Sequence, residues 1–493
     1  MKLFSKPTSK LILVILCILN AVTHFHTGAT TKAAYPNEKP TVFNNGEQAI
    51  DAFEGSIQVL ENRNNPESRL IPLKYIRFPA TGENTGTPII YLSGGPGGSG
   101  IATAKYPGFR FPLFMALREF GDVIALDQRG TGRSKVAPKC KSNYFIPLDQ
   151  KANEAKIELL YRKAAQECVE FWQREGVDVL GYTSIQSAMD IDELRQHFNA
   201  KKVTLWGISY GSHLALASLK VMPGKIDKII IASAEGLNQT VKLPTRTDSY
   251  FDRLQIAINE QPKAAKTYPD VKALMNRVHG KLKTNPISLK LAKEDGSELN
   301  FLFQSFHMQG IASAMISDPQ RGVAKLLSMY SALDQGVTRF LPKIIKRAGF
   351  DKSQISFDVM SFGMDIASGM SEKREKLVNQ QAKTSLLGKY LNFPMPQLNK
   401  VVDGLDLGNE FRRYPKSDVA TLLLTGTLDG RTYPQAQKEA TQGLTNLSQV
   451  LVVNGGHNLF MLSPQVIEVI KTFLKGEKVG ISEIKVELPA FVK

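Results

Sequence analysis

The sequence has few of the residues that mark metal centres. It contains three cysteines in 493 residues, and neither C-x-x-C nor histidine-rich spacing occurs, so no metal site is expected. It shows no internal repeat and no long tract of biased composition. With 42% hydrophobic and 22% charged residues, the composition is that of a globular protein. The length exceeds one ordinary domain, so a second domain or a large insertion is expected.

Acidic residues are outnumbered by basic ones, and the formal net charge is +16 at pH 7. The lysines are dispersed, with some density in 262–283, and no basic motif with interleaved aromatic residues occurs. We interpret the charge as a solvated surface that favours acidic partners or acidic envelope surfaces. Nucleic-acid binding is the weaker alternative.

Long apolar runs are also missing, except for a short one near the N-terminus. Lys2, Lys6 and Lys10 precede the run 11–22, which is too short to span a bilayer and is typical of a secretory signal. With cleavage after Ala29, the mature chain is predicted to be secreted or periplasmic, without a membrane span. The alternative is an uncleaved N-terminal anchor.

Removal of the signal leaves two cysteines, Cys140 and Cys168, because Cys17 lies within the apolar run. In an exported protein such a pair predicts a single disulfide. Two buried thiols are the alternative.

Short apolar segments alternate with longer polar or helical stretches over most of the chain. An early pair, 56–62 and 70–78, flanks a turn and predicts a hairpin. The alternation indicates an α/β class of fold, in which a mostly parallel sheet is covered by helices on both faces. The predicted buried strands are 87–92, 122–127, 202–207, 228–233, 420–426 and 449–455.

The interval between the strands 228–233 and 420–426 interrupts this alternation. It contains mainly amphipathic helical segments and one predicted hairpin, 287–303. An insertion of this length predicts a lid over the site. The expected organisation is a signal at 1–29, an α/β domain at 30–237, a helical cap at 238–410 and the second part of the α/β domain at 411–493.

The strand 202–207 runs into Gly207-Ile-Ser209-Tyr-Gly211, and a helix-like segment follows. This is the G-x-S-x-G pattern in its strand–turn–helix context, where the glycines leave room for a strained turn that presents the serine oxygen. Ser209 is therefore the predicted nucleophile. A serine hydroxyl is a poor nucleophile without a base, so the rest of the chain must supply one.

The base and its acid are predicted from chain order and strand placement. In folds that present a nucleophile on this strand–turn–helix motif, the acid follows the nucleophile in the chain and the histidine follows the acid, each after a strand. His457 follows the late strand 449–455, and Asp429 follows the strand 420–426. We expect Asp429 to hold the imidazole in one tautomer and His457 to take the Ser209 proton.

The glycine loop GGPGGSG (94–100) allows two interpretations. It fits the G-x-G-x-x-G dinucleotide fingerprint, and Asp127 ends the next strand, as that fingerprint requires. However, Pro96 lacks an N–H, and the segment after the loop contains two prolines. The alternative is an oxyanion hole made by the N–H groups of Gly95 and Tyr210, in which a bare backbone lets the substrate carbonyl approach.

Five motifs in a fixed order are GGPGGSG (94–100), DQRGTGRS (127–134), WGISYGS (206–212), LLLTGTLDGRTYP (422–434) and GGHN (455–458). Together they resemble α/β-hydrolase serine peptidases of the prolyl aminopeptidase and tripeptidyl aminopeptidase type, in particular the secreted branch. The resemblance implies an α/β-hydrolase fold with a large helical cap. It also implies that the substrates are peptides with a free N-terminus. Within DQRGTGRS, we interpret Asp127 and Arg129 as a pair that holds a turn.

An enzyme that binds a protonated N-terminus needs carboxylates near the scissile bond. The family has an acid just after the sixth strand, where this chain has Glu235, and one in the cap, to which Asp365 is faintly similar. A surface or helix-capping role is the alternative for both residues. The chain also departs from the family at Gly430, where proline usually follows the acid.

These observations predict an exported serine aminopeptidase that uses Ser209, Asp429 and His457 and needs neither metal nor cofactor. The first alternative is an exported carboxylesterase with the same triad. The second is a binding protein on a hydrolase scaffold, against which the intact triad argues. A nicotinamide enzyme would require observed cofactor binding.

Overall fold

The computed structural model describes residues 34–83 and 86–492. The predicted signal, 1–29, lies outside the described residues. Within the described ranges, no helix is both long and apolar enough to cross a bilayer.

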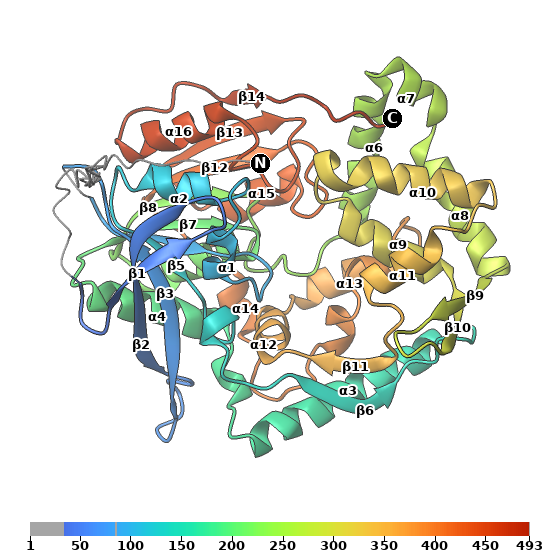
Figure 1. Cartoon of the computed structure of the whole chain (residues 1–493), viewed down its shortest axis with the longest axis horizontal. Coiled ribbons are helices and arrows are strands. Elements are labelled where there is room, and N and C mark those ends of the chain that lie inside the picture. Colours follow the sequence, from blue (N-terminus) through green and yellow to red (C-terminus); the bar gives the residue numbers. More distant parts are fainter. Residues whose placement is uncertain (1–33, 84–85, 493) are drawn as a thin grey trace, which may run out of the picture. The chain divides into compact units, whose positions relative to one another are not determined.

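A ten-stranded sheet organises the fold (Figure 1). Its strands are β1 (Lys39–Asn44), β2 (Ala49–Leu60), β3 (Leu70–Phe78), β4 (Ile89–Leu92), β5 (Val123–Leu126), β7 (Val203–Ile208), β8 (Ile226–Ala232), β12 (Ala420–Gly426), β13 (Leu447–Val453) and β14 (Glu483–Lys485). They lie in the order β1-β2-β3-β5-β4-β7-β8-β12-β13-β14. Strands β1, β2, β3 and β5 pair antiparallel, and every pairing from β5 to β14 is parallel. The predicted α/β-hydrolase fold class is thus confirmed.

Helices cover both faces of this sheet. One face carries α1 (Gly100–Ala104), α2 (Phe111–Leu117) and α16 (Pro464–Leu474). The other carries α3 (Glu154–Arg174), α4 (Ser184–His197), α5 (Tyr210–Val221) and part of α15 (Pro434–Thr441). Two short 3-10 helices, Gly132–Ser134 and Val179–Gly181, lie in the connections.

The central strands are apolar along their whole length because both faces are covered. In β4, Ile89 and Tyr91 join the core under α1, α2 and α16. Ile90 and Leu92 point the other way and join the core under α3, α4 and α5. All four side chains are buried, which explains why this strand reads as an unbroken apolar run.

The chain between β8 and β12 is mainly helical, as expected. It contains α6 (Pro244–Asn259), α7 (Pro262–Thr267), α8 (Val271–Thr284), α9 (Ser305–Met315), a π-helix (Pro319–Val323), α10 (Ala324–Asp334), α11 (Leu341–Ala348), α12 (Val359–Ser368), α13 (Glu372–Gln381), two 3-10 turns (Gly388–Leu391, Met395–Leu398) and α14 (Gly408–Arg412). The predicted hairpin is present as β9 (Ile287–Ala292) and β10 (Glu298–Phe303). Much of this insertion packs around its own apolar core, which includes Tyr250, Met308 and Tyr330.

The insertion is also tied to the first half of the chain. Its strand β11 (Gln354–Phe357) pairs antiparallel with β6 (Cys140–Phe145). Cys140, at the start of β6, forms a disulfide with Cys168 of α3, with 5.6 Å between the two Cα atoms. The predicted disulfide is therefore present, and it joins β6 to α3.

Candidate active site

Ser209 lies at the sharp turn between β7 and α5. Its backbone has φ 54° and ψ −125°, a conformation that is costly for a residue with a side chain. The flanking glycines are needed because of crowding. A Cβ atom on Gly207 would lie 2.5 Å from the Gly211 carbonyl oxygen, and one on Gly211 would lie 2.0 Å from that of Leu92. The G-x-S-x-G spacing is thus a packing requirement of this turn.

Asp429 and His457 are in direct contact. The imidazole Nδ1 of His457 lies 3.0 Å and 3.2 Å from the two carboxylate oxygens of Asp429. Asp429 is fully buried, and its carboxylate also accepts hydrogen bonds from the amide and hydroxyl of Thr432. Burial would raise the pKa of Asp429, but the His457 imidazole and these hydrogen bonds hold it below its ordinary value. The carboxylate is therefore charged at neutral pH and orients the ring so that Nε2 is left for the nucleophile.

The loop of His457 is held by residues on both sides. Its carbonyl accepts a hydrogen bond of 2.7 Å from the hydroxyl of Ser233, which follows β8. The next residue, Asn458, donates its amide to Asp318 of the insertion at 2.8 Å. The imidazole position thus depends on both the sheet and the insertion.

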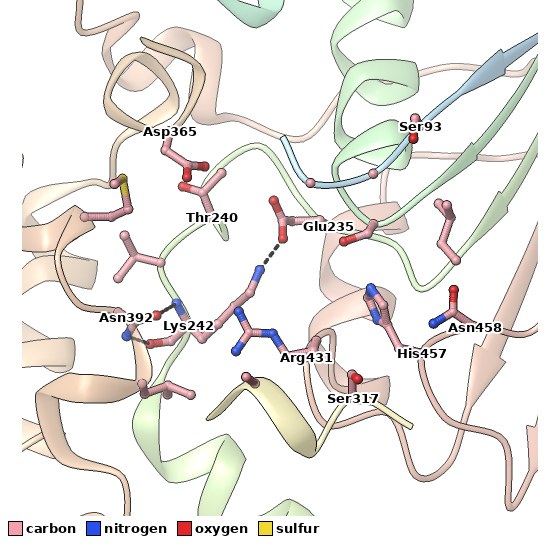
Figure 2. A pocket seen from close by; sticks show the side chains of 18 of the residues that line it. Ser93, Glu235, Thr240, Lys242, Ser317, Asp365, Asn392, Arg431, His457 and Asn458 are labelled. Carbon is pink, nitrogen blue, oxygen red and sulfur yellow. Dashed lines mark hydrogen bonds and ion pairs between the residues drawn. The ribbon is translucent and has the colours of Figure 1, made fainter. Parts of the chain in front are cut away.

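Ser209 and His457 line one cavity of about 480 Å³, within the usual range for a small-molecule site. It lies beyond the carboxyl ends of the parallel strands, where ligands bind in open α/β sheets. Glu235 and Asp365 line the same cavity (Figure 2), as does Gly95. The structure therefore brings together residues that are far apart in the sequence.

The glycine loop runs beside the nucleophile. A Cβ atom on Gly94 would lie 3.2 Å from Cβ and 3.8 Å from Oγ of Ser209. Gly95 has φ 131°, which favours glycine. Tyr210 is the first residue of α5, so its N–H has no partner within the helix. Tyr210 directly follows the nucleophile, and Gly95 directly follows Gly94, which lies beside the nucleophile. The role of both residues as oxyanion donors remains a prediction.

The interpretation of Asp127 and Arg129 as a pair is wrong, although both residues are buried and structural. Asp127 accepts hydrogen bonds from Ser99 at 2.5 Å and from the amides of Ile101 and Arg133. Arg129 instead makes two hydrogen bonds to Asp190 of α4. Because Asp127 already braces the glycine loop, its carboxylate is not presented to a ribose, which weighs against the dinucleotide interpretation.

Comparisons with known proteins agree with this geometry. Residues 87–284 match the family described as the alpha/beta hydrolase fold. The chain contains an α/β-hydrolase domain. It is 28% identical over 192 residues to serine protease Hip1 of Mycobacterium tuberculosis, over 37% of this chain and 36% of that relative. It is 25% identical over 189 residues to the tripeptidyl aminopeptidase of Streptomyces coelicolor, over 36% of this chain and 34% of that relative.

These matches span about a third of the length of the curated relatives. Among solved structures, a proline iminopeptidase-related protein of Thermus thermophilus aligns with a TM-score of 0.35 and 15% identity, over 86% of this chain and 97% of that one. The predicted resemblance to α/β-hydrolase peptidases is confirmed by the relatives' names.

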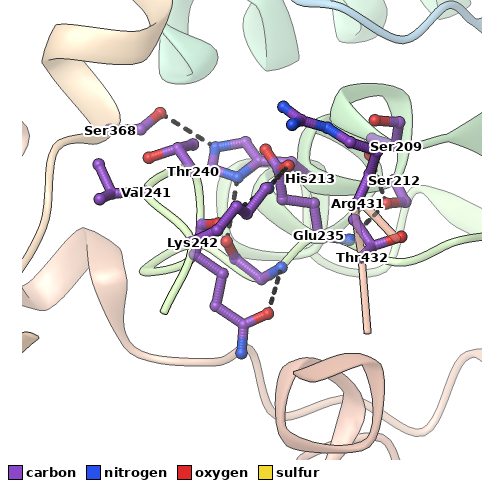
Figure 3. A network of polar contacts seen from close by, with 12 residues as sticks. Ser209, Ser212, His213, Glu235, Thr240, Val241, Lys242, Ser368, Arg431 and Thr432 are labelled. Atoms are coloured by element: carbon purple, nitrogen blue, oxygen red, sulfur yellow. Dashed lines mark hydrogen bonds and ion pairs between the residues drawn. The ribbon is translucent and has the colours of Figure 1, made fainter. Parts of the chain in front are cut away.

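Glu235 is buried and is already paired. Its carboxylate forms an ion pair with the ammonium of Lys242 (Figures 2 and 3). Its amide donates to the hydroxyl of Ser212 at 2.9 Å, and that hydroxyl donates to the carbonyl of Ser209. Burial would raise the pKa of Glu235, but the charge of Lys242 holds it below its ordinary value. Glu235 is thus a charged group whose nearest partner is an internal cation.

Asp365, on α12, differs from Glu235. Among the residues that the structure describes, none donates a hydrogen bond to its carboxyl. Burial, and then the charge of Glu235, raise the pKa of Asp365 to about 7. Asp365 is therefore poised between its two protonation states at neutral pH.

Sequence reasoning missed the cations of this cavity: Arg110, Lys242 and Arg431. Lys242 lies in the segment that leaves β8, and Arg431 lies two residues after Asp429. Arg431 could have been found by a search for basic residues beside the predicted acids, whereas Lys242 lies further along the chain from Glu235.

Proposed function

We propose that this hydrolase is an exported serine aminopeptidase that releases one or a few residues from peptides with a free N-terminus. The observation that carries the proposal is the arrangement of the cavity. Ser209 and His457 line it together with Glu235 and Asp365, and the buried Asp429 contacts the imidazole of His457 from behind the cavity wall. The peptidase names of the relatives, and the disulfide expected of an exported protein, support it.

The proposed reaction is acyl transfer through a covalent intermediate. Ser209 Oγ attacks the peptide carbonyl while Nε2 of His457 accepts its proton. The carbonyl oxygen becomes an oxyanion, which the N–H groups of Gly95 and Tyr210 stabilise. The protonated imidazole, stabilised by Asp429, gives the proton to the leaving amine, and the C–N bond breaks.

The acyl group then stays on Ser209 until water removes it. His457 takes a proton from water, and the oxygen attacks the ester carbonyl. When the second tetrahedral intermediate collapses, the imidazolium returns its proton to Ser209 Oγ. The released fragment leaves as a carboxylic acid.

Recognition of the free N-terminus is assigned chiefly to Asp365. Its carboxyl faces the cavity without a hydrogen-bond donor in the described residues, whereas Glu235 is neutralised by Lys242. A substrate ammonium beside Asp365 would favour its ionised form. Glu235 then contributes a second, weaker attraction.

A carboxylesterase is the second candidate, because the Glu235–Lys242 pair leaves only one carboxyl for an amine. Esters need the triad and the oxyanion hole but no ammonium site. The two candidates therefore differ in whether turnover requires a free amine.

The test compares the mature protein with its Ser209→Ala variant on three fluorogenic sets. These are free-amine aminoacyl and tripeptidyl amides, the same amides with blocked amines, and short-chain esters. We expect the free-amine amides to be cleaved and the blocked amides not to be. Ser209→Ala should lower kcat by at least about 10⁴-fold. Turnover of esters only would establish the esterase instead, and full activity of Ser209→Ala would overturn both.

A further inference from the structure

Arg431 places a guanidinium in the cavity beside the catalytic acid. Its amide donates to Asp429 at 2.7 Å, so the backbone of Arg431 is part of the turn that presents that carboxylate. Its side chain lines the cavity. In the view of Figure 2 it lies between the Glu235–Lys242 pair and the imidazole of His457.

The guanidinium is held at one of its three nitrogen atoms. Nη1 donates to the carbonyl of Ser313 at 3.1 Å and to its hydroxyl at 2.9 Å. Ser313 belongs to α9 and is buried. Nε and Nη2 remain for another acceptor, and their geometry suits the two oxygens of a carboxylate.

Of the other two cations of the cavity, Lys242 has a counter-ion and Arg110 has none in the part of the chain that the structure describes. Lys242 is paired with Glu235 and also donates to the Gln239 carbonyl at 3.0 Å. Arg110 donates to Asn458 at 3.3 Å and packs over the rings of Phe109 and Phe460. Its Nε and Nη1 have no hydrogen-bond partner among the described residues, but both atoms are fully buried and so are out of reach of a ligand.

Within the described residues, Arg431, like Arg110 and unlike Lys242, has no counter-ion, and it differs from Arg110 in that its free nitrogen atoms are not among the fully buried ones. Over 34–83 and 86–492, no carboxylate lies within ion-pair distance of its guanidinium. A half-buried cation next to the Lys242 ammonium is stabilised by any anion that enters.

We propose that Arg431 binds a carboxylate of the substrate near the scissile bond, and that the hydrolase therefore prefers peptides that place a carboxylate there. This inference rests on the proposed function and names its substrate class. The carboxylate comes either from an aspartate or glutamate side chain or from the C-terminus of a short peptide. With Asp365 on the ammonium and Arg431 on the carboxylate, the cavity fits a substrate that carries both charges.

The test uses isosteric substrate pairs that differ only in the carboxylate. Free-amine Glu and Gln amides, and Asp and Asn amides, probe the side chain, while dipeptides and their C-terminal amides probe the terminus. We expect kcat/KM to be about ten- to a hundredfold higher for the acid in at least one kind of pair. If only the Glu/Gln and Asp/Asn pairs show the preference, the bound carboxylate is a side chain. If only the dipeptide pairs show it, the bound carboxylate is the C-terminus.

Variants then assign the preference to Arg431. Arg431→Met should abolish the discrimination ratio, and Arg431→Lys, which keeps the charge without the fork, should retain part of it. Arg347→Gln, at an exposed position on α11, is the matched control and should leave the ratio unchanged. If Arg431→Met fails to fold, Arg431→Gln and the wild-type ratios still decide the matter.

Binding to Ser209→Ala protein separates this inference from the proposed function. Calorimetry with Glu- and Gln-containing tripeptides should show tighter binding of the acid, lost in Ser209→Ala/Arg431→Met. If the wild type cleaves peptides but shows the same kcat/KM and the same affinity for the acid and the amide, the role of Arg431 is overturned. The aminopeptidase proposal is then unaffected. If no peptide is cleaved or bound, the proposed function fails, and Glu and Gln esters then test Arg431 alone.

Discussion

The amide of His457 donates a hydrogen bond of 2.9 Å to the carbonyl of Ser317. Ser317 belongs to the insertion between α9 and the π-helix. Its neighbour Asp318 accepts hydrogen bonds from the amide and the side chain of Asn458. The base of the proposed triad is therefore positioned by the insertion as well as by the sheet.

Removal of the Asp318 carboxylate should lower kcat more than it raises KM. In Asp318→Ala the loop of His457 loses two acceptors, and a displacement of about 1 Å at the base can cost about a hundredfold in rate. Steady-state kinetics and the rate of labelling of Ser209 by a fluorophosphonate measure the effect. Asp318→Asn keeps one acceptor oxygen, so its kcat should lie between those of the wild type and Asp318→Ala. Glu294→Ala, on the exposed turn of the β9–β10 hairpin, is the control, and equal labelling rates in all variants would contradict the prediction.

Two glycine-to-alanine changes, both in helices, should have opposite effects. A Cβ atom at Gly211 of α5 would lie 2.0 Å from the Leu92 carbonyl oxygen, whereas one at Gly280 of α8 would meet nothing within 4 Å. We expect Gly211→Ala to yield little folded protein. Gly280→Ala should raise the free energy of unfolding by about 0.5–1 kcal/mol. Soluble yield and urea denaturation report both, and normal folding of Gly211→Ala would refute the crowding argument.

The buried ion pair gives a third prediction. Lys242→Met leaves the Glu235 carboxylate buried without its cation, which should lower the free energy of unfolding by about 3–5 kcal/mol. The double variant Glu235→Gln/Lys242→Met should recover most of that loss, because no buried charge remains. Lys290→Met, which breaks an exposed pair with Glu298, is the control and should cost less than about 1 kcal/mol. A single-variant loss as small as the control's would mean that Glu235 is well solvated.

The pKa of Asp365 gives the fourth prediction, about stability against pH. Folding raises this pKa from its ordinary value to about 7. Between these two pH values the folded state holds a proton that the unfolded state has released, so stability falls as pH rises through the window. Asp365→Asn removes this dependence. The variant should therefore melt higher than the wild type at pH 8, with a smaller difference at pH 4.

Thermal melts of both proteins across that pH range test the sign. Asp295→Asn, at the exposed β9–β10 turn, is the control for loss of a carboxylate, and its difference from the wild type should not grow with pH in the same way. A difference for Asp365→Asn that is larger at pH 4 than at pH 8 would contradict the prediction.

Much of the fold could be predicted from local patterns. The strands at 87–92, 202–207 and 420–426 are apolar runs because both faces of the sheet are covered, and such runs are visible in the sequence. The Ser209 turn was predictable because its flanking glycines are set by short-range crowding. In these cases the cause lies within a few residues of the effect.

The electrostatics of the cavity could not be predicted in the same way. Arg129 reaches Asp190 on another helix and does not pair with its neighbour Asp127. Arg431 contacts Ser313 more than a hundred positions earlier in the chain. Which charges meet depends on how the insertion docks, and no local pattern encodes that docking.

The link between β6 and β11 bears on the length of the fragment released. Helix α12, which carries Asp365, begins directly after β11, and β11 is paired with a strand that the disulfide fastens to α3. A Cβ atom on Gly363 would lie 2.7 Å from the Tyr182 carbonyl oxygen, so α12 is also pressed against the chain before α4. If Asp365 binds the substrate amine as proposed, these contacts fix the distance between Asp365 and Ser209. This fixed distance then sets the number of residues that the enzyme removes in each cycle.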